Sequence, residues 1–190
     1  MPEWEIHQKW AQKMGLTLEA ARYVDKLIDM SKKVPEYRDL YTRLFAEGAE
    51  ESEFFKEFFK EIPDDKINEW KGLSWIVRWK IDSITQRTIP PGRVKILEHD
   101  GGRGKKGYLD DLEAFVQQKF LCLNKGCESL KAWYLHHILD YMSSCGYFEQ
   151  EEFFQRIEER LEVILNEDLY DEVKNFVSIH WKEILSDLGF

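Results

Sequence analysis

Histidine and aspartate side chains with metal-ligand chemistry gather in three short segments of this chain. The segments are EWEIHQKWA near the start, ILEHD in the middle and AWYLHHILDYM further on. Their candidate ligands are His7, His99, Asp100, His136, His137 and Asp140. Imidazole and carboxylate groups hold zinc, iron or manganese in proteins. Because the three segments lie far apart in sequence, only the fold can bring them together at one site.

The third segment offers a pair of candidates at helical spacing. His136 and Asp140 are four residues apart, so they share one face of a helix and lie one turn from each other. A helical wheel places His137 within the core side of this helix, and His136 and Asp140 at its edge. A buried carboxylate needs a partner, which for Asp140 is a metal, an arginine, a lysine or a tyrosine hydroxyl. For His137, a core histidine bonded to a backbone carbonyl is an equally good interpretation.

The other two segments each carry an alternative interpretation. His7 falls on an apolar stripe between Trp4 and Ala11, where a lone histidine is more often structural than a ligand. The interpretation of His7 as a metal ligand is strengthened because other candidate ligands exist in the chain. The doublet of His99 and Asp100 precedes a glycine pair that allows a tight turn and close backbone approach. The alternative for the doublet is a solvated loop whose aspartate caps a helix.

A glycine-rich loop follows the doublet and carries three cations. In the sequence GGRGKKG, the side chains of Arg103, Lys105 and Lys106 and the backbone amides could together hold a phosphate group. The loop does not match the P-loop pattern, which needs G-x-x-x-x-G-K-[ST]. An ordinary flexible loop is the alternative, but a phosphate site beside a metal would make chemical sense.

Hydrophobic periodicity predicts a helical chain nearly throughout. Gly15 is expected to end the first helix and Thr17 to cap the second. The exception to the helical pattern is an irregular segment at 88–107, which holds one short extended stretch at 93–97. The helices are expected at 3–14, 17–33, 36–47, 50–62, 66–87, 108–123, 127–144, 149–165 and 168–187. We therefore predict an all-α fold, with residues 1–190 forming a single compact domain of about eight helices.

Composition excludes some partners and leaves others open. The net charge of −9 argues against nucleic acid and anionic membranes as default partners. There is no membrane-length apolar run and the amino terminus lacks signal-peptide order, so we expect a cytoplasmic protein. The three cysteines lack a CxxC spacing, so a disulfide framework is not expected and all three are assigned to the core. The oligomeric state stays open, a homodimer included.

The order of these ligands resembles that of the HD-domain metal-dependent phosphohydrolases, an all-helical family. An early helical histidine, a central His-Asp doublet and a later aspartate match His7, the doublet at 99–100 and Asp140. The resemblance implies that these residues bind one metal and that His136 and His137 can bind a second. The His-x-x-x-Asp pair is also similar to that of the zinc-dependent phospholipase C and P1-nuclease family, but the match is poorer.

These observations lead to two hypotheses of different classes. The first is a metal-dependent phosphohydrolase acting on a small phosphate ester or nucleotide, with one or two divalent transition-metal ions (zinc, manganese, iron, cobalt or nickel). Its expected catalytic residues are Asp100, Arg103, Lys105 and Lys106. The second is a helical binding or scaffold protein without chemistry, in which the aromatic face at 54–59 is an interface or core. Bound-metal content distinguishes the two.

Overall fold

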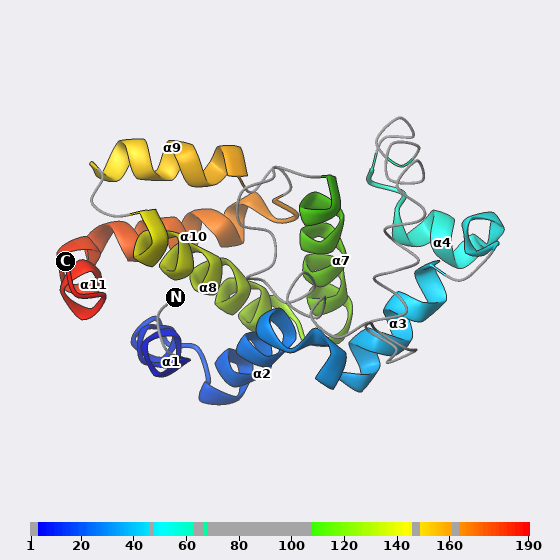
Figure 1. The fold of residues 1–190 in the computed structure, drawn as a ribbon, viewed down its shortest axis with the longest axis horizontal. Coiled ribbons are helices and arrows are strands. Elements are labelled where there is room, and N and C mark those ends of the chain that lie inside the picture. Colours follow the sequence, from blue (N-terminus) through cyan, green and yellow to red (C-terminus); the bar gives the residue numbers. More distant parts are fainter. Residues whose placement is uncertain (1–3, 46–47, 63–66, 68–107, 146–148, 161–163) are drawn as a thin grey trace, which may run out of the picture. The chain divides into compact units, whose positions relative to one another are not determined.

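The computed structural model describes residues 4–45, 48–62, 67, 108–145, 149–160 and 164–190, and all regular secondary structure within these ranges is helical (Figure 1). The prediction of an all-α fold is therefore confirmed. The α-helices described are α1 (Trp4–Lys13), α2 (Leu18–Asp29), α3 (Pro35–Phe45), α4 (Glu53–Phe58), α7 (Tyr108–Asn124), α8 (Cys127–Cys145), α9 (Gln150–Arg160), α10 (Glu167–Ile179) and α11 (Trp181–Asp187). Two 3-10 turns, Ser31–Lys33 and Ala49–Glu51, lie before and after α3.

The backbone contacts divide the chain into two compact units. One unit combines Met1–Asp25 with Leu121–Phe190, and the other comprises Lys26–Phe120. The prediction of a single domain stays a prediction. The first unit contains all the candidate ligands that the structure describes.

Helix α8 is the central element of the first unit and contacts α1, α9 and α10 (Figure 1). Its side chains are buried around most of its circumference, including Leu130, Trp133, Tyr134 and Ile138. A helix that is apolar on nearly all sides is stable only inside a core. The prediction that this helix is central and largely buried is therefore confirmed.

The turn between α1 and α2 fixes where the first two helices of this unit point. The amide of Leu16 donates to the carbonyl of Ala11, and that of Gly15 donates to Gln12, each over 2.9 Å. This pair of bonds is a Schellman motif, and the φ of 87° at Gly15 is the left-handed conformation that the motif requires. Thr17 then caps α2, because its hydroxyl oxygen accepts a hydrogen bond from the backbone amide of Ala20 at 3.2 Å. Both sequence predictions for this turn are confirmed.

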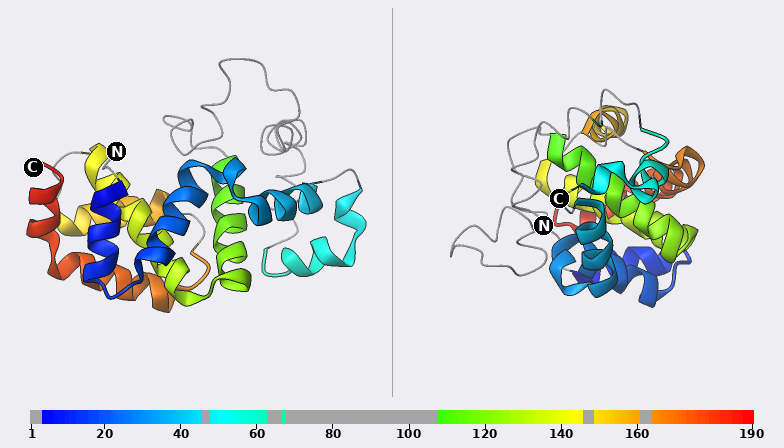
Figure 2. Two further views of the ribbon diagram at one scale, coloured as in Figure 1. Left: turned by 90° about the horizontal axis from the view of Figure 1, so that it is seen from below. Right: turned by 90° about the vertical axis from the view of Figure 1, so that its right-hand side faces the viewer.

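Helix α1 is also held at its outer face by ion pairs to α11. Lys9 Nζ lies 2.5 Å from Asp187 Oδ2, and Lys13 pairs with Glu183. The two helices lie side by side in Figure 1 and in the left view of Figure 2. These exposed pairs contribute little stability each. They join the outer face of α1 to α11.

The second unit has an aromatic core. The rings of Phe55, Phe58 and Phe59 on α4 are buried, and Phe58 and Phe59 pack on Phe115 of α7 with ring centroids 6.0 and 5.5 Å away. The predicted aromatic face at 54–59 is thus mostly core. Its half-buried member, Phe54, is covered by the guanidinium of Arg43 at 3.5 Å from the ring centroid.

Two further predictions about helices and cysteines were wrong in part. The predicted helix at 168–187 breaks at His180, whose backbone leaves the helical conformation between α10 and α11. Cys122 and Cys127 are exposed rather than core residues, because they lie where α7 ends and α8 begins. The predicted helix at 66–87 and the irregular segment at 88–107 lie outside the described residues.

None of the helices in the described ranges combines the length and apolar character that crossing a bilayer requires.

Candidate metal centre

Helix α1 delivers His7 into the interior of its unit. His7, Trp10 and Ala11 are the buried residues of this helix, at the i, i+3 and i+4 spacing of one helical face. The imidazole of His7 is 4% exposed. The apolar stripe identified from the sequence therefore carries this histidine into the core.

Helix α8 delivers His136 and Asp140 from one face, as their spacing predicts. Their side chains are 2% and 5% exposed. His137, one residue further round the helix, is half-buried and packs against Trp133 with ring centroids 4.1 Å apart. The helical wheel had placed His137 on the core side and the other two at its edge. That placement was wrong, because His7 of α1 and Asp25 of α2 pack against the face of α8 that carries His136 and Asp140.

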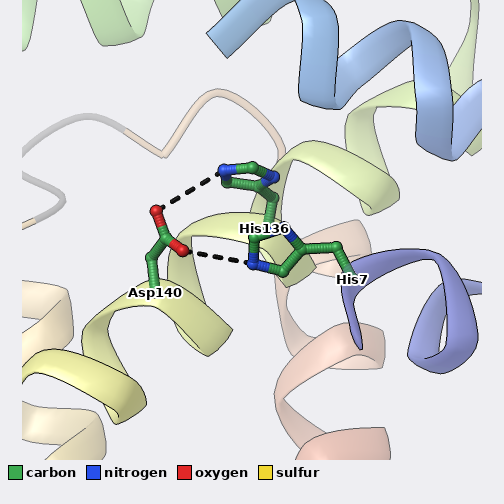
Figure 3. A group of neighbouring side chains, drawn as sticks. All are labelled: His7, His136 and Asp140. Atoms are coloured by element: carbon green, nitrogen blue, oxygen red, sulfur yellow. Dashed lines mark ion pairs between the residues drawn. The ribbon is translucent and has the colours of Figure 1, made fainter. Parts of the chain in front are cut away.

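Asp140 faces one nitrogen of each of two imidazole rings (Figure 3). Its Oδ1 lies 3.1 Å from His7 Nε2, and its Oδ2 lies 3.5 Å from His136 Nε2. The two rings lie against each other, with centroids 3.9 Å apart and planes tilted by 39°. One ligand atom from each of the three residues lies within 4.8 Å of the others. This buried group could hold a metal ion.

A second carboxylate, which the sequence analysis missed, lies on the opposite side of the two rings. Asp25 on α2 is 1% exposed, and its Oδ1 lies 2.9 Å from His136 Nδ1 and 3.6 Å from His7 Nδ1. The sequence did contain a signal. Asp25 follows Val24 within the apolar stripe of α2, and a carboxylate on the buried face of an amphipathic helix needs a partner.

The electrostatics of the group follow from its burial. Burial alone would lower the pKa of His136, but Asp140 and Asp25 outweigh it and raise that pKa to about 9. The pKa of His7 is lowered below its usual value by burial and by the neighbouring His136, despite Asp140 and Asp25. Without a metal, the structure therefore favours one protonated ring between two carboxylates. Two buried carboxylates need compensating positive charge, because an isolated buried ion is costly.

The contacts of His7 also fit a metal ligand. Although His7 Nε2 lies 3.1 Å from Asp140 Oδ1, neither of its ring nitrogens forms a hydrogen bond with acceptable geometry. Buried polar atoms are normally bonded, and each exception calls for an explanation. An ion bound by both Nε2 atoms and by Asp140 would supply one.

The remaining predicted site residues are not brought to this group within the described structure. His99, Asp100, Arg103, Lys105 and Lys106 lie outside the described residues. His180, at the break between α10 and α11, packs on Trp10 and Phe176 with ring centroids 5.7 and 4.8 Å away.

Two imidazoles and one carboxylate form a ligand set that proteins use for catalytic metals. Catalytic zinc is often held by His₂Glu sets, and non-haem iron by two histidines and one carboxylate, both with open positions. No protein-family model, curated protein or solved structure matches this chain.

Proposed function

We propose that this protein is a metal-dependent phosphohydrolase acting on a small phosphate ester or nucleotide. Its divalent transition-metal ion would be held by His7, His136 and Asp140. The observation that carries the proposal is the convergence of two imidazoles and one carboxylate at a buried point, with ligand atoms within 4.8 Å of one another. The ion would be zinc, manganese, iron, cobalt or nickel, because imidazole and carboxylate suit all of these.

The choice of ligands favours a catalytic over a structural ion. Structural zinc sites are usually closed by four ligands rich in cysteine, whereas catalytic sites keep three protein ligands and an open position. Cys122 and Cys127 are exposed, and neither belongs to the His-Asp group. Three protein ligands without sulfur are the pattern of a catalytic ion.

The protein side chains would divide the work between holding the ion and holding the substrate. His7, His136 and Asp140 would hold the ion, through the two Nε2 atoms and the carboxylate. A bound divalent ion supplies Lewis acidity toward a phosphoryl oxygen and lowers the pKa of water. The predicted ligands His99 and Asp100 would extend the metal site. The three cations of the 101–107 loop would bind phosphate and offset its charge in the transition state.

The charge of the chain bears on the size of the substrate. A net charge of −9 repels extended polyanions such as nucleic acids. A small phosphate ester or nucleotide carries fewer charges, and a metal with three loop cations can compensate for them. The proposal therefore names a small substrate rather than a polymer.

A second candidate is a non-enzymatic helical protein in which His7, His136, Asp140 and Asp25 form a structural network. The burial of all four side chains and the 2.9 Å hydrogen bond between His136 and Asp25 favour this alternative. Such a network would hold α1, α2 and α8 together by hydrogen bonds and ion pairs, without a metal ion.

The activity test uses protein purified without a histidine tag and loaded with each of the five metals in turn. It is assayed against nucleotides and generic phosphate esters, beside Asp140→Asn and the matched variant His137→Gln. We expect metal-dependent hydrolysis that falls at least 100-fold in Asp140→Asn, about 2.7 kcal/mol of transition-state stabilisation. His137→Gln should stay within a few fold of the parent. A metal-loaded parent that hydrolyses none of these substrates would overturn the phosphohydrolase proposal and favour a non-enzymatic helical protein.

A further inference from the structure

Asp25 bonds differently from Asp140, although both carboxylates face the same two rings. The contact from His136 Nδ1 to Asp25 Oδ1 is a hydrogen bond of 2.9 Å, buried at both ends. The Nδ1 atom of His7 lies 3.6 Å from the same oxygen. Asp25 thus meets the Nδ1 side of the imidazole pair, and Asp140 meets the Nε2 side.

The orientation of the Asp25 carboxylate is itself fixed by α1. The side-chain amide of Gln8 donates to Asp25 Oδ2 at 3.1 Å, and Arg22 Nε donates to Gln8 Oε1 at 3.4 Å. With Oδ2 bonded to Gln8, Oδ1 is left to face the two histidines. A carboxylate held in this way at 1% exposure is suited to accept protons from rings whose other nitrogens bind an ion.

We infer that Asp25 is the positioning residue of the metal centre, accepting Nδ1–H from His136 and His7 so that both Nε2 atoms can bind an ion beside Asp140 through their lone pairs. The inference rests on the proposed metal site. A metal-bound histidine usually donates its other ring N–H to a carboxylate, a carbonyl or water, which fixes its tautomer and raises its basicity. Here one carboxylate would serve both histidines. His7 Nδ1 lies 3.6 Å from Asp25 Oδ1, so this second hydrogen bond would form only when the ion draws the ring into place.

Charge balance supports the same arrangement. With both rings neutral, Asp25 and Asp140 place two negative charges in the interior. One divalent ion on the Nε2 side would offset both charges without a cationic side chain. The Nδ1 protons are retained, so a single ion satisfies the group.

The test is a cobalt(II) titration of metal-free protein, in which the visible spectrum reports coordination and competition gives the affinity. The variant is Asp25→Asn, and the matched control on the same helix is Glu19→Gln, an exposed carboxylate changed to its amide. We expect about one cobalt ion in the parent, and an affinity about 10- to 100-fold weaker in Asp25→Asn with a spectrum of the same type. Glu19→Gln should bind as the parent does.

Gln8→Ala provides a second test if Asp25→Asn does not fold, with exposed Gln12→Ala as its control. Gln8→Ala should weaken cobalt binding in the same direction and by less, whereas Gln12→Ala should not. Equal cobalt affinity in parent and Asp25→Asn, even with a lowered melting temperature of the metal-free protein, would make Asp25 structural and overturn the inference.

Two further outcomes separate this inference from the proposed function. Two cobalt ions in the parent and one in Asp25→Asn would make Asp25 a ligand of a second ion and overturn its positioning role alone. A parent that binds no cobalt, zinc or manganese would overturn the metal site, and the inference with it.

Discussion

Asp25 and Asp140 lie on opposite sides of two imidazole rings, so the two nitrogens of each ring face different carboxylates. The Nδ1 atoms face Asp25, with one hydrogen bond of 2.9 Å, and the Nε2 atoms face Asp140 at 3.1 and 3.5 Å. The spacing of His136 and Asp140 predicted that they would share a helix face. The spacing could not predict the pairing with His7, because it says nothing about which helices meet; only the family resemblance grouped His7 with Asp140.

The first prediction at this scale concerns pH and the metal-free protein. The pKa of His136 is raised to about 9 in the folded protein against about 6.5 in an unfolded chain. Its contribution to stability is therefore complete below pH 6.5 and is lost as pH rises toward 9. The loss is on the order of 3 kcal/mol, at about 1.4 kcal/mol per pKa unit.

His7 acts in the opposite direction and in a different window. Its lowered pKa means that the unfolded chain binds its proton more tightly, so its effect appears only below about pH 6.5, where stability falls as pH drops. Urea unfolding of metal-free protein at several pH values measures both the loss of stability above pH 6.5 and the loss below it. His136→Gln should remove the loss above pH 6.5, and a parent whose stability stays flat from pH 6.5 to 9.5 would contradict the account.

At the scale of elements, the sequence predicted the turn that aims α1 and α2 but not all helix ends. Gly15 and Thr17 have local chemistry that acts within a few residues, so their roles could be predicted. The break at His180 involves ring contacts to Trp10 and Phe176, and Trp10 belongs to a distant helix. Tertiary contacts of this kind leave no periodic signal. Asp25 is different, because a carboxylate on the buried face of α2 is visible in the sequence, but its partner His136 lies on α8 and is not.

Gly15 supplies the second prediction. Its φ of 87° is unfavourable for any L-residue, and a Cβ added there would meet no atom within 4 Å. The cost of Gly15→Ala is therefore conformational, about 1 kcal/mol in the free energy of unfolding. Urea denaturation measures it, with exposed Gln12→Ala on α1 as a nearly neutral control. A Gly15→Ala protein as stable as the parent would show that the turn relaxes without the Schellman motif.

The glycine-rich loop supplies the third prediction, which still rests on sequence alone. Replacing Arg103, Lys105 and Lys106 by serine should leave metal content unchanged. It should lower phosphohydrolase efficiency at least tenfold, about 1.4 kcal/mol of transition-state stabilisation. Added salt should weaken substrate binding more in the parent than in the variant.

The matched control for the loop replaces three exposed lysines elsewhere by serine: Lys26, Lys33 and Lys182. It removes the same charge and should retain parental activity. Full activity in the loop variant would make the loop a solvated connector and require phosphate to be held elsewhere.

At the scale of the whole molecule, metal binding and folding should be coupled. The candidate ligands come from α1 and α8, and Asp25 comes from α2, so an ion would join segments that the unfolded chain separates by more than 100 residues. A ligand that binds only the folded form adds about 2.7 kcal/mol at a free concentration 100 times its dissociation constant. Hydrophobic periodicity predicted a helical chain, but only the fold shows that these segments meet.

Thermal melting with and without metal measures this coupling. Zinc or manganese should raise the melting temperature of the parent and leave that of Asp140→Asn unchanged, because the variant lacks a ligand. The metal-free forms should differ less from each other than the metal-loaded forms do. If Asp140→Asn destabilises both forms equally, Asp140 is a structural hydrogen-bonding residue.

The most direct test of the central claim, an ion held by His7, His136 and Asp140, is the metal content of protein purified without a histidine tag. Elemental analysis after dialysis against trace zinc and manganese should find about one ion per chain in the parent and in His137→Gln. It should find almost none in Asp140→Asn or in His136→Gln, provided that both variants retain the helical circular dichroism of the parent. Stoichiometric metal in Asp140→Asn, or none in the parent, would contradict the account.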